Sequence, residues 1–375
     1  MSVTTEVVIV GAGIVGAACA YELAKEKISV TIVDSSGVGT GATAAGMGHI
    51  VAMDDSEAQF ALTRCSQKLW EELREQYPDT VEYQQSGTIW VAADEAEMAE
   101  VQRKHEYYAQ RGIASEILDA KALEEAEPSL RRPLAGGLLV PGDAVVYPPC
   151  AAMFLVEKAL ELGAQIHTDK TIVSIGNGKA VLRDGTSISA KVIVNAAGQF
   201  APKLTPGIDI RPRKGHLVIT ERYPAKIHHQ LVELGYLKSA HSTTADSVAF
   251  NLQPRKTGQV LIGSSRQYAR EDSKVDGDIL ATMLRRAFAY VPDLVGLSAI
   301  RVWTGFRAAT PDKLPLIGPW PGDPSVFLAA GHEGLGITTS LATGRLIADH
   351  YLGRKSEIPS GPYLPSRQQE AFGHA

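Results

Sequence analysis

The 375-residue chain is long enough for two domains, and its 45% hydrophobic and 21% charged content is that of a globular protein. A net charge of -5 with scattered basic residues disfavours nucleic acid as a partner. The three cysteines (Cys19, Cys65, Cys150) are isolated from one another, which predicts no metal centre. The lack of a run of about 20 apolar residues predicts no membrane span, and an N-terminus without a signal peptide predicts a cytoplasmic protein.

The first predicted elements form a β-α-β unit. Residues 7–10 predict a strand, residues 14–25 a helix and residues 29–33 a second strand that ends in an aspartate. The next stretch, residues 37–50, consists mostly of glycine and other small residues. Such a composition favours close approach of the backbone to a ligand over a plain surface loop.

Three glycines in G-x-G-x-x-G spacing join the first strand to the helix. Gly11 would make the tight turn, Gly13 would let backbone amides reach a pyrophosphate, and Gly16 would let the helix pack closely on the strand. Asp34, at the end of the second strand, would accept hydrogen bonds from ribose hydroxyls. The motif therefore predicts a dinucleotide site, and a glycine-rich turn without a ligand is the alternative.

The rest of the chain alternates between nucleotide-type units and β-rich stretches. Helices are predicted over 56–76, 95–110, 150–165 and 277–290, and strands over 84–92, 171–175, 192–198, 215–220, 247–252 and 259–264, with a hairpin turn at Asp184-Gly185. The C-terminal part predicts a strand, a glycine turn and a helix. We therefore expect an α/β domain built from residues 1–80, 141–205 and 305–375, and a β-rich domain built from residues 81–140 and 206–304.

The choice of dinucleotide depends on two further segments. The acidic Asp34 disfavours a 2′-phosphate, which leaves NAD or FAD. An extended flavin needs distant pieces of chain along its length, and the glycine-rich residues 37–48 and 331–340 supply them. FAD is therefore favoured, whereas an NAD-linked dehydrogenase would be a colourless protein.

The chain resembles the family of FAD-dependent amino-acid oxidoreductases that includes D-amino-acid oxidase, glycine oxidase, sarcosine oxidase and D-amino-acid dehydrogenases. The segments that carry the resemblance are VVIVGAGIVGAACAYELA, TAAGM, VIVNAAG, RPRKGHLVIT, WTGFRAATPDKLPLIGP and GHEGLGITTSLATGRLIAD. It covers nearly the whole chain and implies a Rossmann-type FAD-binding domain with an inserted β-rich substrate domain.

The resemblance also implies a set of flavin contacts. The backbone at Ala197 would approach FAD, the main chain of Val173 would meet the adenine, and the amides after Gly334 would face flavin N1 and the C2 carbonyl, where reduction places negative charge. For Val173, core packing is the alternative. The expected flavin-binding residues are Gly11, Gly13, Ile14, Val15, Gly16, Asp34, Thr43, Ala44, Ala45, Gly46, Met47, Val173, Ala197, Gly198, Gly305, Arg307, Gly334, Leu335, Gly336, Ile337 and Thr338.

Arg307 resembles the arginine that holds the substrate carboxylate through a bidentate pair. Such a pair would orient the α-carbon over flavin N5 for hydride transfer, which leaves an imine. Arg301 and Arg266 are competing candidates, and an internal ion pair or a surface arginine is the alternative role for Arg307.

Two histidines are further catalytic candidates. His49, after TAAGM, would contact substrate and take a proton from its ammonium group, and His332 lies in the flavin-facing turn. A structural hydrogen bond is the alternative for both. His216 and His241 have weaker claims.

Several positions depart from the family pattern. A tyrosine of glycine oxidase that contacts the substrate carboxylate is Asn251 here, so Asn251 is a substrate candidate and the pocket differs from that of glycine oxidase. Gly305 and Thr43 stand where relatives attach FAD through cysteine or histidine, which implies non-covalent FAD. Leu261 stands where sarcosine oxidase has its oxygen-activating lysine, which favours a dehydrogenase.

The C-terminal motif looks most like bacterial flavoprotein subunits acting on D-hydroxyproline, on opines or on glycine in cyanide synthesis. This resemblance implies a D-hydroxyproline or D-proline dehydrogenase first, an opine or simple D-amino acid as substrate second, and glycine or sarcosine third. A hetero-oligomer with a second flavoprotein or iron–sulfur subunit is implied as well. The rival of another class is a non-catalytic or tRNA-modifying flavoprotein.

Overall fold

The computed structural model describes residues 3–235, 246–268 and 270–368, so His241 lies outside the described residues. The chain divides into two compact units. Unit 1 comprises residues 1–81, 147–212 and 306–375, and unit 2 comprises residues 82–146 and 213–305. The junctions expected from the sequence lie a few residues away. The assignment of cofactor binding to one unit and substrate binding to the other stays a prediction.

The centre of unit 1 is a parallel sheet. β1 (Val3–Val10) pairs in parallel with β2 (Val30–Val33) and β11 (Ser187–Asn195). β8 (Gln165–His167) follows β2, and beyond β11 come β18 (Asp323–Ala330) and the antiparallel β17 (Leu316–Trp320). The middle of β1 is fully buried, as expected for a strand covered on both faces. The predicted β-α-β unit is confirmed.

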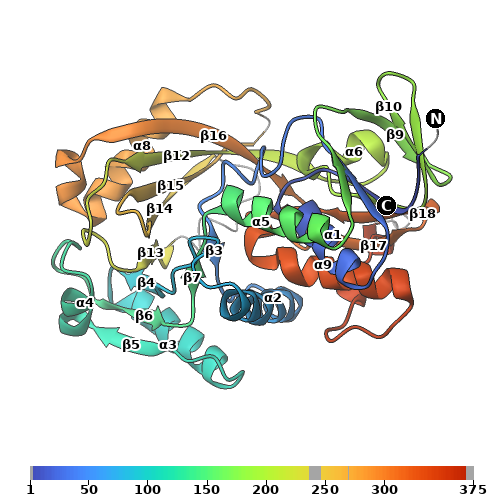
Figure 1. Ribbon diagram of the computed structural model, residues 1–375. Helices are drawn as coiled ribbons and strands as arrows, with labels where there is room; N and C mark the ends of the chain where they lie inside the picture. Colours follow the sequence, from blue (N-terminus) through green and yellow to red (C-terminus); the bar gives the residue numbers. More distant parts are fainter. Residues whose placement is uncertain (1–2, 236–245, 269, 369–375) are drawn as a thin grey trace. The chain divides into compact units, whose positions relative to one another are not determined.

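Helices of unit 1 pack closely around the glycine motif. α1 (Ile14–Lys25) packs against both α5 (Pro148–Glu161) and α9 (Gly336–Leu352) (Figure 1). A Cβ on Gly344 of α9 would lie only 2.5 Å from the carbonyl oxygen of Ala18, so glycine is what lets these two helices touch. The start of α1 and the start of α9 therefore belong to one packed body.

The remaining elements of unit 1 are α2 (Glu57–Gln76), β3 (His49–Ile50), β9 (Ile172–Gly176), β10 (Lys179–Leu182), η1 (Gly198–Phe200), α6 (Ala201–Leu204), β19 (His332–Glu333) and η3 (Gly361–Tyr363). α2 begins after Ser56, whose hydroxyl accepts a hydrogen bond from Gln59 N. The Asp184-Gly185 turn joins β10 to β11, which confirms the predicted hairpin. α5 begins at Pro148, two residues before its predicted start, because proline fits the first turn of a helix.

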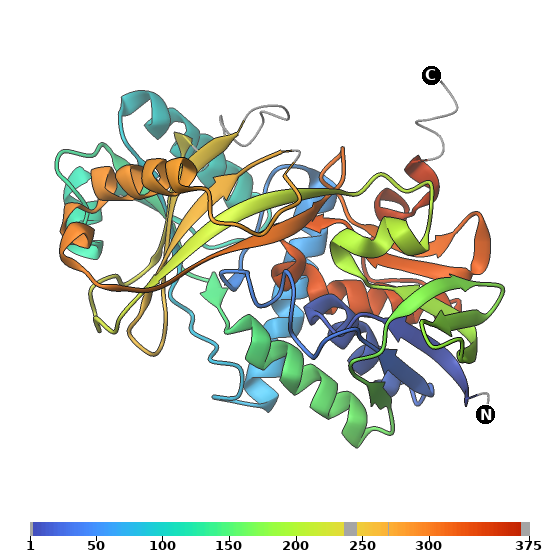
Figure 2. The ribbon, with the colours of Figure 1, turned by 90° about the horizontal axis from the view of Figure 1, so that it is seen from above.

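Unit 2 is built on a mostly antiparallel sheet. The strands lie in the order β16, β12, β15, β14, β13, β4, β6 and β5. Their bounds are β16 (Ala299–Ala309), β12 (Arg211–Thr220), β15 (Val260–Arg266), β14 (Ser247–Pro254), β13 (Gln230–Glu233), β4 (Thr88–Ala92), β6 (Gly136–Val140) and β5 (Glu116–Asp119), with the short β7 (Ala144–Val145) outside this order. The long strands β12 and β16 run side by side (Figure 2). The predicted strand 84–92 begins only at Thr88, because Gly87 adopts a positive φ.

α8 (Gly277–Tyr290) covers one face of this sheet. The core beneath it includes Ile89, Leu231 and Leu252. α3 (Glu95–Ala109), α4 (Ala120–Ala126) and η2 (Pro292–Gly296) complete unit 2. Among the described residues, no helix has the combination of length and hydropathy that crossing a bilayer requires.

Candidate active site

The glycine motif forms a tight turn between β1 and α1. Gly11 has φ +111°, and a Cβ at this position would lie 2.6 Å from the carbonyl oxygen of Ala196. A Cβ on Gly16 would lie 1.9 Å from the carbonyl oxygen of Gly11. Side chains are therefore excluded at both positions, and the first-turn amides of α1, which have no partners within the helix, face the turn.

The TAAGM segment connects the starts of α1 and α9. Thr43 is buried, and its hydroxyl accepts a hydrogen bond of 3.0 Å from the backbone N–H of Ile14. A Cβ on Gly46 would lie 2.6 Å from Cδ1 of Ile337, the second residue of α9. The same short segment thus contacts both helix N-termini that the sequence assigns to the dinucleotide.

Asp34 holds the glycine turn through its carboxylate. Oδ2 accepts a hydrogen bond of 2.7 Å from Ala12 N, and Oδ1 accepts one of 2.8 Å from Ser36 N. Each carboxylate oxygen has a further acceptor site, so the geometry is compatible with ribose hydroxyls as additional donors. The ribose contact itself stays a prediction.

The end of β11 is fixed by Asn195, which is fully buried. Its Nδ2 donates to the carbonyl of Ala201 and to the hydroxyl of Thr205, while its Oδ1 accepts from Ala197 N at 3.3 Å. These bonds shape the turn at Ala197 and Gly198 beside the glycine motif. Val173, on β9, is 48% exposed, which excludes core packing as its role; an adenine contact of its main chain stays a prediction.

The N-terminus of α9 is the second helix start of the site. The helix begins at Gly336 after Leu335, with no side-chain cap and no acidic residue in its first turn. The amides of this turn carry the positive end of the helix dipole. A group that becomes negatively charged on reduction would be stabilised here.

Arg307 lies against this turn. It belongs to β16, where the next residue, Ala308, pairs with Glu333. A Cβ on Gly334 would lie 3.4 Å from Nε of Arg307 and 3.6 Å from its Cδ. The structure therefore brings the predicted carboxylate-binding side chain to the predicted flavin-facing glycines, all within unit 1.

His332 fixes the turn to α9. It is buried, and its Nε2 lies 3.0 Å from the hydroxyl of Thr343, which itself donates to the carbonyl of Thr339. Nε2 must therefore carry the proton and donate. Burial lowers the pKa of His332 to about 3, so the ring is neutral near pH 7. This geometry favours the structural alternative, and a catalytic role stays a prediction.

His49 lies near the first turn of α9. Its carbonyl oxygen accepts a hydrogen bond of 2.8 Å from the hydroxyl of Thr338. Thr338 is also bound by Trp70 of α2, whose indole N–H donates to the carbonyl of Thr338 at 3.2 Å. His49 is thus placed beside the expected flavin-facing helix, and its proton-transfer and substrate roles stay predictions.

The other candidates belong to unit 2. Asn251 lies on β14, and its Oδ1 is buried with no hydrogen-bond partner among the described residues. The guanidinium of Arg301 lies 5.2 Å from the ring centroid of Trp303, and this engagement weakens its claim to the carboxylate. Arg266 ends β15 and stays a candidate. His216 is buried between Ser265 and the backbone of Asp276, and burial lowers its pKa.

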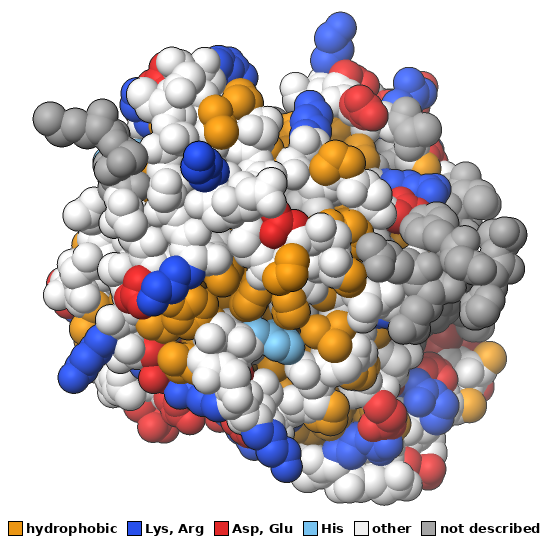
Figure 3. Space-filling model, turned by 90° about the vertical axis from the view of Figure 1, so that its right-hand side faces the viewer, with side chains coloured by type: hydrophobic (Ala, Val, Ile, Leu, Met, Phe, Trp, Pro, Cys, Tyr) orange, Lys and Arg blue, Asp and Glu red, His pale blue; other side chains and the backbone are white. Residues whose placement is uncertain are grey.

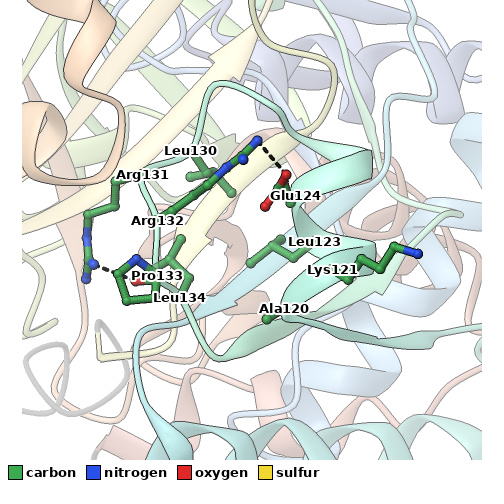
Figure 4. A pocket seen from close by; sticks show the side chains of 9 residues that line it. All are labelled: Ala120, Lys121, Leu123, Glu124, Leu130, Arg131, Arg132, Pro133 and Leu134. Atoms are coloured by element: carbon green, nitrogen blue, oxygen red, sulfur yellow. Dashed lines mark hydrogen bonds and ion pairs between the residues drawn. The ribbon is translucent and has the colours of Figure 1, made fainter.

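A surface pocket of about 320 Å³ also lies in unit 2, beside α4 (Figure 4). Its arginines are engaged locally: Arg132 pairs with Glu124 at 2.6 Å, and Arg131 donates to the carbonyl of Pro133 at 2.7 Å. The pocket shares no residue with the predicted site. Among the described residues, no cluster of three histidine, cysteine or acidic side chains has the arrangement of a metal site.

The charges on the face shown in Figure 3 are mixed. Lysine and arginine side chains there are interspersed with aspartate and glutamate, and apolar side chains gather near the centre of the face. A surface of this kind lacks the continuous basic footprint that phosphate backbones require.

The residues present in unit 1 fit FAD. Two helix N-termini present first-turn amides that have no partners within their own helices, glycines leave no Cβ between the backbone and a ligand, and Asp34 supplies an acceptor at the end of β2. Residues 6–350 match the model of the FAD dependent oxidoreductase (DAO) family. The chain belongs to this family, is an FAD-dependent oxidoreductase, and the predicted Rossmann-type fold is confirmed.

Individual relatives agree with this assignment. Glycine oxidase of Geobacillus kaustophilus is 28% identical, with 96% of this chain and 97% of the relative covered, and a crystal structure of glycine oxidase from that organism superposes with a TM-score of 0.87, covering 98% and 99%. Hydrogen cyanide synthase subunit HcnC of Pseudomonas aeruginosa is 27% identical over 98% and 97%. L-proline dehydrogenase from P. horikoshii shares the fold, with a TM-score of 0.88 at 24% identity over 99% of each chain.

The residues of α2 that bind the backbone of α9 were not predicted from the sequence. Trp70 and Ser66 of α2 bind the backbone of α9, at Thr338 and at Ala342. Both lie on a helix that the sequence marks only as amphipathic. A signal does exist for Ser66, since a polar residue on the buried side of an amphipathic helix indicates a hydrogen-bond partner.

Proposed function

We propose that this protein is an FAD-dependent dehydrogenase that oxidises the C–N bond of a secondary or D-amino acid, with D-hydroxyproline or D-proline as the leading substrate. The observation that carries the proposal is the position of Arg307, whose Nε would lie 3.4 Å from a Cβ on Gly334, two residues before the start of α9. In this proposal Arg307 would bind the substrate carboxylate, and the nearby helix N-terminus would stabilise negative charge.

Each residue has a defined part in this proposal. Bound FAD would supply the acceptor for the hydride that leaves the α-carbon. Arg307 binds the substrate carboxylate through two parallel hydrogen bonds and thereby fixes the direction in which the α-carbon points. The amides at the start of α9 stabilise the charge that reduction creates. Asn251 offers its unpartnered Oδ1 as an acceptor for a substrate donor.

His49 is the proposed proton acceptor, and His332 is a positioning residue. His332 stays neutral because its pKa is far below 7, and its bond to Thr343 fixes the turn that contacts Arg307. No second ionisable group is needed when the amine binds in its neutral form. The chemistry then depends on orientation more than on proton transfer.

The proposal includes a partner subunit and non-covalent FAD in the cytoplasm. HcnC is named as a subunit, and a Nostoc relative at 26% identity is a bifunctional ThiO/ThiG protein. Among the described residues, no group of three histidine, cysteine or acidic side chains is placed to hold a cluster for onward electron transfer. A second flavoprotein or iron–sulfur subunit would then receive the electrons. Co-purification from the native host, followed by an absorbance spectrum and iron analysis, tests this part.

The test of the main proposal is anaerobic mixing with a panel of D-, N-methyl and cyclic amino acids. We expect D-hydroxyproline or D-proline to bleach the oxidised flavin spectrum, and a dye to reoxidise it faster than oxygen does. Bleaching by an opine, glycine or sarcosine alone would select the alternative substrates. An unchanged spectrum with the whole panel would contradict the proposal and favour a flavoprotein of another class.

A further inference from the structure

Helix α2 packs against α9 (Figure 1) and binds its backbone through two side chains. Trp70 and Ser66 lie four residues apart on α2, so they lie on the same face of that helix, and both are fully buried. The indole N–H of Trp70 donates to the carbonyl of Thr338 at 3.2 Å. The hydroxyl oxygen of Ser66 accepts from the N–H of Ala342, also at 3.2 Å. α2 therefore presents one donor and one acceptor to α9.

The two backbone groups that α2 binds belong to one step of the helix. In an α-helix the N–H of each residue bonds to the carbonyl four residues earlier, and Ala342 follows Thr338 by four residues. Trp70 and Ser66 thus bind both ends of a single hydrogen-bonded turn. Hydrogen bonds weaken steeply when they are misaligned, so a shift of α9 along or about its axis would disturb this match.

The same part of α9 is bound by β3 as well. Thr338 is the third residue of α9 and is 1% exposed. Its hydroxyl donates to the carbonyl of His49 at 2.8 Å. The carbonyl and the hydroxyl of Thr338 are therefore held by different elements. The position of the first turn of α9 is defined by directional bonds and not by packing alone.

The bonds from α1 act on α9 further along the helix. The ion pair between Arg345 and Glu22, at 2.6 Å, lies nine residues, or more than two turns, after Gly336. Near Gly336 itself α1 contributes the side chain of Val15, which is apolar and cannot hydrogen bond. The electrostatic effect of a helix end falls off within its first turn. Binding by α2 therefore concerns the part of α9 that acts on a neighbouring charge.

We propose that Trp70 and Ser66 are positioning residues for FAD, which fix the first turn of α9 and thereby set the reduction potential of the bound flavin. The inference rests on the proposed function, in which the amides of this turn stabilise the charge that reduction creates. Amides that are already held in place need no reorganisation when this charge appears, whereas a loosened turn stabilises it less. Loss of the bonds from α2 therefore favours the oxidised flavin and lowers its potential.

The test compares Trp70→Phe with Tyr363→Phe in the holoenzyme. Trp70→Phe keeps an aromatic ring and removes the N–H that binds α9. Tyr363→Phe is the matched control, because it removes a buried donor to the carbonyl of Ala58 of α2, at 2.6 Å. The flavin potential is measured by reductive titration with dithionite in the presence of a reference dye.

We expect the equilibrium between flavin and dye to shift toward oxidised flavin by about 3- to 10-fold in Trp70→Phe, because about one buried hydrogen bond is lost. For a two-electron couple this is a potential lower by about 15 to 30 mV. Ser66→Ala should shift the potential in the same direction by less, since Ala342 keeps its partner within the helix. Tyr363→Phe should lower Tm and leave the potential unchanged.

Hydrogen exchange in the oxidised holoenzyme tests the positioning step separately. We expect the amides of residues 339–343 to exchange faster in Trp70→Phe than in the wild type, and at the wild-type rate in Tyr363→Phe. Unchanged exchange would show that Trp70 does not position the turn. Faster exchange with an unchanged potential would show that the turn does not act on the flavin. Either result would overturn the inference.

Two further outcomes are decided by the same measurements. An equal fall in potential in Tyr363→Phe would show that general loosening of unit 1 is the cause, which would also overturn the inference. If Trp70→Phe does not fold, the sign of the shift in Ser66→Ala decides. Dithionite reduces the flavin without an amino acid, so the potentials are obtained even if no amino acid of the panel bleaches the flavin and the proposed substrate class fails.

Discussion

The two units hold their buried polar groups in different ways. In unit 1 the site is made from backbone, because glycines at positions 11 and 16 leave no room for a side chain and two helix starts present their amides. In unit 2 the buried polar groups are side chains, such as the amides of Gln230 and Gln253 on an otherwise apolar sheet. Backbone groups are kept by the fold itself, whereas side-chain groups can be exchanged while the fold is kept.

The sharpest way to break this comparison is Gly16→Ala. The new Cβ would lie 1.9 Å from the carbonyl oxygen of Gly11, so α1 must move away from the glycine turn. We expect the purified protein to lose its flavin, measured as the ratio of absorbance near 450 nm to that at 280 nm. Gly361→Ala is the control, because its Cβ would meet nothing within 4 Å. A fully yellow Gly16→Ala protein would contradict the backbone account.

Gly334→Val sharpens the contrast by adding a side chain to the backbone site. Even a Cβ would touch Arg307 at 3.4 Å, and the larger valine should displace its guanidinium. We expect kcat/KM per bound flavin to fall by about 100-fold, since a shift of about 1 Å in a positioning group can cost this much. Gly334→Ala should lose far less. Equal effects of the two substitutions would argue against a steric cause.

His332 provides a smaller effect with a defined pH dependence. Burial lowers its pKa from 6.5 to about 3, so the folded state binds fewer protons than the unfolded state between these values. Its stabilising effect is therefore complete above pH 6.5 and is lost as the pH falls, by about 1.4 kcal/mol per pH unit. Denaturant titrations from pH 4 to 7 should show that the free energy of unfolding falls less steeply with decreasing pH in His332→Gln than in the wild type. An unchanged slope would show that another group is responsible for the pH dependence.

The difference between the units also decides what the sequence can reveal. Gly11, Gly13, Gly16 and Asp34 lie within one short β-α-β unit, so their spacing alone predicts the turn that the structure contains. The neighbouring buried amides of unit 2 cannot be predicted in this way. Gln253 and Gln230 become neighbours only through strand register, and burial of an amide depends on what covers the sheet. The position of Arg307 beside Gly334 could likewise be predicted only from the resemblance to the family.

The central claim is that Arg307, held at the start of α9, orients the substrate for hydride transfer. Anaerobic stopped-flow reduction of Arg307→Met by the best substrate of the panel tests it most directly, with dithionite reduction as the control for an intact flavin site. We expect normal reduction of the bound flavin by dithionite, and a second-order rate constant for substrate, per bound flavin, at least about 100-fold below that of the wild type, because a charge-assisted pair is lost. Reduction by substrate at the wild-type rate would contradict the account.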